Sequence, residues 1–194
     1  MAELILAASH DCRILEATPD TKYNDAQLDS LSDFESIAEH RSLLRFDFSA
    51  LSNKAFISSG VLSLYMHALD GGDPRPCSIA CRKVTQTGWD EANTTWNQYN
   101  DSGNLNWATP GGDWSGDNQA VSNILTSQAG WYEWDITAMC RDFQATAGSV
   151  ADVLIFKPTQ NGGFKFYSAE EAVQTTLRPK LVITYYIMGN VMLF

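Results

Sequence analysis

The aromatic residues are the part of this sequence whose types and spacing best suit recognition of a ligand. The segment TGWDEANTTWN, residues 87–97, holds Trp89 and Trp96, with acids, amides and threonines around them. An indole face with polar neighbours can stack on a sugar ring, but a tryptophan also buries a large apolar area and anchors a core. The asparagine and threonine side chains can tie an irregular loop back to a sheet. We therefore predict that Trp89 and Trp96 belong to the scaffold.

The other tryptophans divide into two pairs by their surroundings. Trp131 and Trp134 flank a strand that leads into a helix, so they are predicted to pack the scaffold as well. Trp107 and Trp114 lie in a segment rich in Gly, Asn, Asp and Ser, with little around them to bury them. Together with Tyr99 they are the predicted contacts for a ligand or partner. The alternative is that they pack this loop on itself.

The C-terminal residues 187–194 form an apolar arm, which ends in MGNVMLF. An exposed apolar segment usually marks an interaction surface. We expect the arm to contact a partner subunit or to return to its own core, through Met192, Leu193 and Phe194. The whole apolar run LVITYYIMGNVMLF is shorter than the roughly 20 residues that a membrane span needs, so no membrane insertion is predicted.

No combination of residues in the chain matches a catalytic motif. The three histidines lack the spacing of a metal-binding helix, and no Gly-x-Ser-x-Gly turn or phosphate-binding loop occurs. The acid pairs 90–91 and 170–171 are adjacent, so in a strand their side chains point to opposite faces. They cannot by themselves form the facing carboxylates of a glycosidase. A protein that is not an enzyme and has no cofactor is predicted.

Two groups of residues could hold a metal, and neither has the spacing of a known site. Cys77 and Cys81 could form half of a zinc site, but Cys12 and Cys140 stand alone and supply no second close pair. Acids in the glycine-rich segment could offer oxygen ligands to calcium, but without regular spacing: Asp101, Asp113 and Asp117. We expect no metal and cysteines that act as small buried side chains; disulfide pairing stays open.

The charge of the chain excludes one class of partner. The 194 residues carry a net charge of −10, with a pI of about 4.6. Nucleic-acid binding depends on clustered Lys and Arg, so no nucleic-acid partner is expected. The N-terminus has Glu3 where a secretion signal carries positive charge, and its apolar run is too short for a signal core. A protein that keeps its N-terminus and is not exported by a cleaved signal is expected.

Alternating apolar and polar residues predict short strands along most of the chain. In VLSLYMHA, residues 61–68, Leu62, Leu64 and Met66 share one face and Ser63, Tyr65 and His67 the other. Further strands are predicted at residues 3–8, 12–17, 41–48, 78–85, 150–156, 163–168 and 180–188.

One segment has the helical period instead. Asp135 is placed to cap a short helix whose apolar face comprises Ile136, Met139, Cys140 and Phe143. Residues 97–129 read as a long loop insert. We therefore predict a single all-β domain over residues 1–194, an antiparallel β-sandwich of jelly-roll type with one short helix.

The order of motifs resembles the DNRLRE family, a jelly-roll β-sandwich module discussed among carbohydrate-binding modules. The resemblance covers nearly the whole chain, on PDTKYND (19–25), RSLLRFDFSAL (41–51), ISSGVLSLYMH (57–67), TGWDEANTTWN (87–97), GWYEWDITAMCRDF (130–143) and FYSAEE with LRPKLVITY (166–185). It implies a scaffold role for Trp89 and Trp96. The chain departs from the family at Lys22 and Asn24, where Asn and Gly are favoured, and in its longer insert.

Two functions remain from this reading. The first is a structural protein of a bacteriophage virion, such as a capsid decoration protein, made in the host cytoplasm. It would bind the major capsid protein, other virion subunits or further copies of itself. This hypothesis rests on a lone acidic module without a signal and on the apolar ends of the chain. The alternative is an extracellular carbohydrate-binding module that recognises a polysaccharide, which the family resemblance implies directly.

Overall fold

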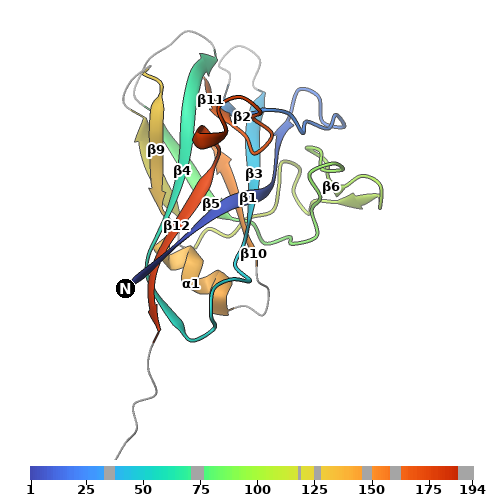
Figure 1. Cartoon of the computed structure of the whole chain (residues 1–194). Coiled ribbons are helices and arrows are strands. Elements are labelled where there is room, and N and C mark those ends of the chain that lie inside the picture. Colours follow the sequence, from blue (N-terminus) through green and yellow to red (C-terminus); the bar gives the residue numbers. More distant parts are fainter. Residues whose placement is uncertain are drawn as a thin grey trace, which may run out of the picture.

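The strands of the chain form two antiparallel layers that are joined by two crossing strands (Figure 1). The computed structural model describes residues 1–32, 38–70, 77–117, 119–124, 128–145, 150–157 and 163–187; at 30–32, 70, 77 and 122–124 only the backbone is described. The first layer comprises β12 (Lys180–Ile187), β4 (Ala55–Asp70), β9 (Gly130–Asp135) and β11 (Gly163–Tyr167). The second layer comprises β3 (Glu39–Asp47), β10 (Val150–Phe156), β5 (Cys77–Lys83) and β8 (Ala120–Ile124). The predicted all-β sandwich is confirmed.

Strand β1 (Ala2–Leu15) belongs to both layers. Its residues 2–7 pair with β12 and its residues 8–15 pair with β3. The prediction of two strands separated by a turn is wrong here, because one continuous strand passes through a register shift between Ala8 and His10. Such a bulge bends a strand without ending it. Strand β2 (Gln27–Ser32) makes a second crossing, between β11 and β3.

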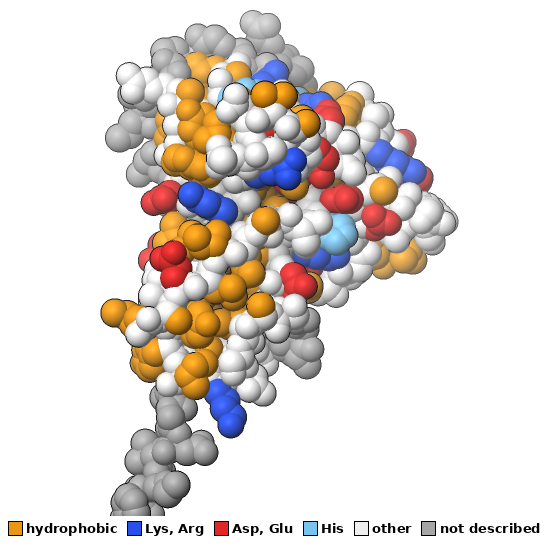
Figure 2. All heavy atoms as spheres, viewed as in Figure 1, with side chains coloured by type: hydrophobic (Ala, Val, Ile, Leu, Met, Phe, Trp, Pro, Cys, Tyr) orange, Lys and Arg blue, Asp and Glu red, His pale blue; other side chains and the backbone are white. Residues whose placement is uncertain are grey.

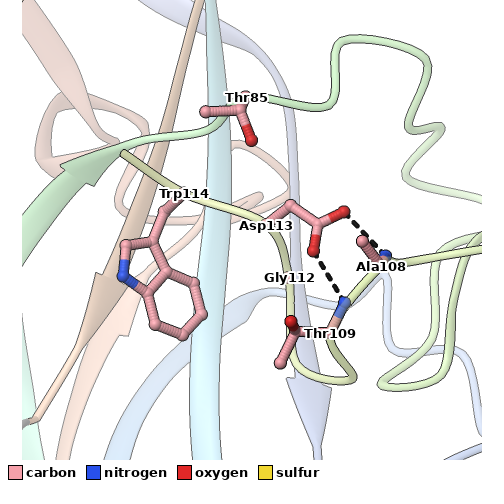
Figure 3. A pocket seen from close by; sticks show the side chains of 6 residues that line it. All are labelled: Thr85, Ala108, Thr109, Gly112, Asp113 and Trp114. Carbon is pink, nitrogen blue, oxygen red and sulfur yellow. Dashed lines mark hydrogen bonds between the residues drawn. The ribbon is translucent and has the colours of Figure 1, made fainter. Parts of the chain in front are cut away.

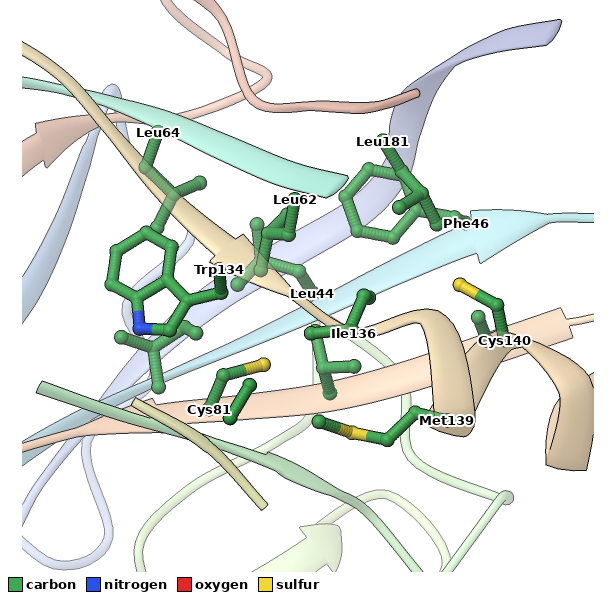
Figure 4. Packing of buried hydrophobic residues seen from close by; sticks show 14 of the residues in the cluster. Leu44, Phe46, Leu62, Leu64, Cys81, Trp134, Ile136, Met139, Cys140 and Leu181 are labelled. Carbon is green, nitrogen blue, oxygen red and sulfur yellow. The ribbon is translucent and has the colours of Figure 1, made fainter. Parts of the chain in front are cut away.

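The space between the layers holds the main hydrophobic core (Figure 4). Side chains that alternate along each strand meet there, among them Leu44 from β3 and Leu64 from β4. Trp134 is fully buried, and its indole nitrogen donates to the carbonyl of Ile79 across the layers at 2.9 Å. The scaffold role predicted for Trp134 is therefore confirmed.

The one α-helix, α1 (Thr137–Ala145), closes an end of this core. The Asp135 carboxylate accepts from the Thr137 amide at 3.0 Å, which is the predicted N-terminal cap. The predicted apolar face is also confirmed, since all four of its members are buried: Ile136, Met139, Cys140 and Phe143. Neither this helix nor the short 3-10 turn η1 (Thr175–Leu177) is long enough to cross a membrane, and the described ranges contain no other helix.

A third layer of irregular chain covers the outer face of the second layer. We call residues 84–117 and 119 the loop layer; it includes the short hairpin β6 (Gln98–Asn100) and β7 (Leu105–Asn106). A second hydrophobic core lies beneath it, formed by Cys12, Ile14, Leu43, Ala80, Val84, Trp89, Trp96, Trp107, Leu154 and Phe156. Trp89 and Trp96 are only 2% and 6% exposed, which confirms that they pack the scaffold.

Helix α1 depends on a glycine for its close approach to β4. A Cβ atom at Gly60 would lie 2.6 Å from Cys140 Sγ and 3.5 Å from the Thr137 Cα. The Gly60 carbonyl also accepts from the Ile136 amide at 2.8 Å, and its amide donates to Thr137 Oγ1 at 2.9 Å. These contacts hold the start of the helix against the middle of the strand.

We expect Gly60→Ala to lower the free energy of unfolding by about 1–3 kcal/mol, because the added methyl group overpacks a closed core. Urea denaturation measures the effect. Gly116→Ala is the matched control, since a Cβ there meets nothing within 4 Å. Adding Cys140→Ala to Gly60→Ala should recover part of the loss by removing the clashing sulfur. Equal stability of Gly60→Ala and the wild-type protein would contradict the proposed packing constraint.

Candidate functional site

The loop-layer residues that were predicted to contact a ligand differ in their exposure. Trp107 is only 4% exposed, and its indole nitrogen donates to the Thr95 carbonyl at 3.0 Å. The expectation that little surrounds Trp107 is wrong, because the loop layer folds over it and packs it on the second layer. Tyr99 is partly exposed and lies edge-to-face with Trp107, with 5.7 Å between ring centroids. The predicted contact residues Met192, Leu193 and Phe194 lie outside the described residues.

Trp114 is partly exposed and lines a shallow pocket of about 400 Å³ (Figure 3). We call this the Trp114 pocket; its other lining residues are Thr85, Ala108, Thr109, Gly112 and Asp113. The Arg41 guanidinium lies 4.6 Å from the centroid of the Trp114 ring and 4.7 Å from that of Trp96. The Arg41 guanidinium therefore lies against one face of the Trp114 indole and also contacts the buried Trp96 ring.

A second group of aromatic side chains lies on the outer face of the first layer. It comprises Trp131 on β9, Tyr65 and His67 on β4, and Tyr167 on β11, all partly exposed. Strand register brings them together, because Tyr65 pairs with Trp131, and Met66 pairs with Phe166 next to Tyr167. We call these four residues the aromatic strip. Figure 2 shows hydrophobic side chains gathered over β4 and β9 on this face.

The rings of the aromatic strip form a continuous row across three strands. Tyr65 lies 5.5 Å from Trp131 in an edge-to-face arrangement and 6.0 Å from Tyr167 with nearly parallel rings. The His67 ring stacks on Tyr167 at 4.4 Å. Because the sheet fixes the backbone under each ring, the row is held in one geometry before any ligand arrives.

Charged and polar groups border the row of rings. The Lys180 ammonium lies 4.2 Å from the centroid of Trp131. Next to it, Ser63 Oγ donates to Glu133 at 3.3 Å. The strip therefore combines apolar ring surface with hydrogen-bonding groups at its edge, which is the usual composition of a small-molecule site.

The surroundings of His67 favour its neutral form. Burial lowers its pKa, and the positive charge of Lys165 lowers the pKa further. Its Nε2 is buried without a hydrogen-bond partner among the described residues. A neutral imidazole keeps one donor and one acceptor.

The connection between β11 and β12, residues 168–179, stands beside the strip. Its Glu171 carboxylate accepts from the amides of Val173 and Gln174 at 2.8 and 2.9 Å, and its carbonyl accepts from Arg178 Nε at 2.8 Å. The connection follows Tyr167 of the strip directly in the chain, and the charge of Glu171 raises the pKa of His67, which opposes the lowering by burial.

A buried carboxyl group anchors the start of this connection. Asp11 is fully buried, and one of its oxygens accepts from the Ala169 amide at 2.8 Å. Burial raises its pKa to about 9, and the neighbouring carboxylates Glu170 and Glu91 raise it as well. The Asp11 side chain is therefore protonated at neutral pH, which lets it lie against Glu170 without two negative charges meeting.

Sequence reasoning found part of the strip and missed part. The alternation in β4 predicted correctly that Ser63, Tyr65 and His67 point away from the core. Trp131 was predicted to pack the scaffold with Trp134, but the two lie three positions apart in the strand, so they point to opposite faces of β9. That alternation within WYEW was the signal available in the sequence.

Comparison with protein families gives a match that covers most of the chain. The profile of carbohydrate-binding module family 96 matches residues 4–185. The protein belongs to this family. Binding modules of this kind are typically non-catalytic, which agrees with the prediction of a protein that is not an enzyme. A search of the curated proteins finds no match.

The match bears on the two functions that the sequence left open. It favours the carbohydrate-binding alternative, and no comparison supports the virion component or a capsid partner. The expected resemblance to a carbohydrate-binding module is thus confirmed at the level of a binding-module family, while the DNRLRE name itself is not confirmed. The contact roles of Tyr99, Trp107 and Trp114 stay predictions for the family 96 module.

The raised pKa of Asp11 predicts how stability of the family 96 module depends on pH. A folded-state pKa of about 9, against a usual value of 3.8, means that the folded state holds a proton that the unfolded chain releases. This contribution to stability is fully present below pH 3.8 and is lost as the pH rises toward 9. The loss is at most about 1.4 kcal/mol per pH unit.

We expect Asp11→Asn to flatten the fall in unfolding free energy between pH 5 and 9, because asparagine imitates the uncharged carboxyl group. Urea denaturation at several pH values gives both curves. Glu3→Gln serves as the control, since Glu3 is an exposed carboxylate on the same strand. A pH profile of Asp11→Asn parallel to that of the wild-type protein would contradict the protonated state of Asp11.

Proposed function

We propose that this family 96 module binds a polysaccharide through the aromatic strip. The observation that carries the proposal is the row of four partly exposed rings on three neighbouring strands, Trp131, Tyr65, Tyr167 and His67. Family membership supports the class of ligand, and in this proposal the sugar units lie along the row.

The chemistry of the strip suits a sugar chain. A pyranose ring offers an apolar C–H face and a rim of hydroxyl groups, so it pairs with an aromatic ring that has polar groups beside it. The tyrosine hydroxyls, the Glu133 carboxylate and the neutral His67 ring can exchange hydrogen bonds with such a rim. The rings stand on a sheet, so little conformational entropy is lost when they bind.

The charged residues near the strip distinguish two classes of polysaccharide by the salt dependence of their binding. Lys180 and Lys165 bring positive charge to the strip, while Glu133 and Glu171 bring negative charge. An uncharged chain would bind with little dependence on salt. A uronate chain would use the lysines, and its binding would weaken as salt screens them.

The test is affinity electrophoresis and isothermal titration calorimetry with mixed-linkage β-glucan, galactomannan, xylan and polygalacturonate, each at low and high salt. Binding to at least one of them is expected, and each of Trp131→Ala and Tyr65→Ala should weaken it about 10-fold or more, as loss of about 1.4 kcal/mol per ring implies. Tyr186→Ala is the matched control, because Tyr186 is an aromatic residue, 40% exposed, on the same layer but outside the strip.

The salt dependence assigns the ligand to the uncharged or the uronate class, and Lys180→Ala should weaken only the uronate. If folded Trp131→Ala and Tyr65→Ala proteins bind as tightly as the wild-type protein, the strip is not the binding surface.

A further inference from the structure

We infer that the Trp114 pocket is a second carbohydrate site, on the opposite side of the molecule from the aromatic strip. This inference rests on the proposed function for its class of ligand, but it concerns a different surface. It makes the module bivalent, with one row that takes several sugar units and one pocket that takes a single unit.

The two sites face away from each other. The aromatic strip lies on the outer face of the first layer, whereas the Trp114 pocket lies in the loop layer, outside the second layer. Both hydrophobic cores separate them. In Figure 1, β9 and β4 lie at the left and the loop layer with β6 at the right. A short oligosaccharide therefore cannot fill both sites on one molecule.

The backbone around the pocket is fixed by hydrogen bonds. Both Asp113 carboxylate oxygens are engaged, by the amides of Ala108 and Thr109 at 2.8 Å each, as the dashed lines in Figure 3 show. The Asp113 carbonyl accepts from the Thr85 amide at 2.9 Å, and Trp114 forms an isolated bridge with Val84. These bonds join the residues that follow β5 to the segment that carries Asp113 and Trp114. The backbone that lines the pocket is therefore fixed before a ligand binds.

The back face of the Trp114 ring is also fixed. Arg41 stands against it, and its Nε donates to the Glu39 carboxylate at 2.9 Å while Nη1 donates to the Gly111 carbonyl at 2.8 Å. Gly111 has a φ of +89°, and a Cβ there would lie 2.7 Å from Arg41 Nη1. The guanidinium and the Phe156 ring, whose centroid lies 5.5 Å from that of Trp114, therefore hold the indole in place, and its exposed part lines the pocket.

The pocket offers the groups that one sugar unit needs. An aromatic ring stands on one side, and the hydroxyl groups of Thr85 and Thr109 on the other can donate to and accept from sugar hydroxyls (Figure 3). The volume of about 400 Å³ lies within the usual range for ligand pockets, roughly 300–1,000 Å³. The Asp113 carboxylate is already used by the loop, so the pocket recognises hydroxyl groups rather than a cation.

Bivalency changes what the module does to a polysaccharide. Two sites that face apart can hold two chains, or two distant stretches of one chain, and the second contact gains from the high local concentration of sugar units. A protein with one site would coat a polysaccharide without joining its chains.

The test is calorimetry with hexasaccharides cut from the same four polysaccharides. For a hexasaccharide that binds, we expect two molecules per wild-type chain, one per Trp114→Ala chain, one per Trp131→Ala chain and none for the double variant. Light scattering with the parent polysaccharide should show cross-linking by the wild-type protein, lost in either single variant.

Thr109→Val removes one hydroxyl at nearly constant volume, and it should weaken only the second site if Trp114→Ala proves unstable. A wild-type stoichiometry of one that is unchanged by Trp114→Ala and by Thr109→Val would overturn this inference. Loss of that single site in Trp131→Ala would at the same time uphold the strip. A single site that disappears in Trp114→Ala and not in Trp131→Ala would overturn the proposed function and the bivalency, and it would make the pocket the carbohydrate site.

Discussion

The structure depends on a second layer that is apolar on both of its faces. In β3, Leu44 points into the main core and Leu43 into the second core, and in β10 the same holds for Ile155 and Leu154. Each buried side chain of this kind stabilises the fold by about 1.5–3 kcal/mol only if something excludes water from it. The sandwich covers one face, and the loop layer must cover the other. The long irregular segment is therefore part of the folded body.

Arginine side chains join the loop layer to the second layer through ion pairs and contacts with tryptophan rings. Arg45 pairs with Asp152 at 2.6 Å and also lies 4.6 Å from the centroid of Trp89. Arg41 takes the equivalent position between Trp96 and Trp114. A guanidinium is flat and weakly hydrated, so it stacks on an indole while it keeps its hydrogen bonds. In this way the loop layer is fastened to the second layer by cations that neutralise acids on the sheet.

Local patterns in the sequence predicted those features that one strand or helix determines alone. The outward position of Tyr65 follows from the two-residue repeat of a strand, and the buried face of α1 follows from the 3.6-residue repeat of a helix. The proximity of Tyr65 to Trp131 and Tyr167 could not be predicted, because it depends on the register between strands that lie far apart in the chain. The burial of Trp107 was missed for a related reason. It requires knowing that the sheet beneath the loop layer has a second apolar face.

The three cysteines whose side chains the structure describes are distributed over both cores. Cys81 and Cys140 lie between the layers, and Cys12 lies under the loop layer, all three as free, buried thiols. Burial raises the pKa of Cys140 to about 12 and that of Cys12 and Cys81 well above the ordinary value, so none of them is a thiolate at neutral pH. Alkylating reagents attack the thiolate. Each thiol can therefore react only when the core that surrounds it opens. The order in which the thiols react would show whether the main core or the second core opens first.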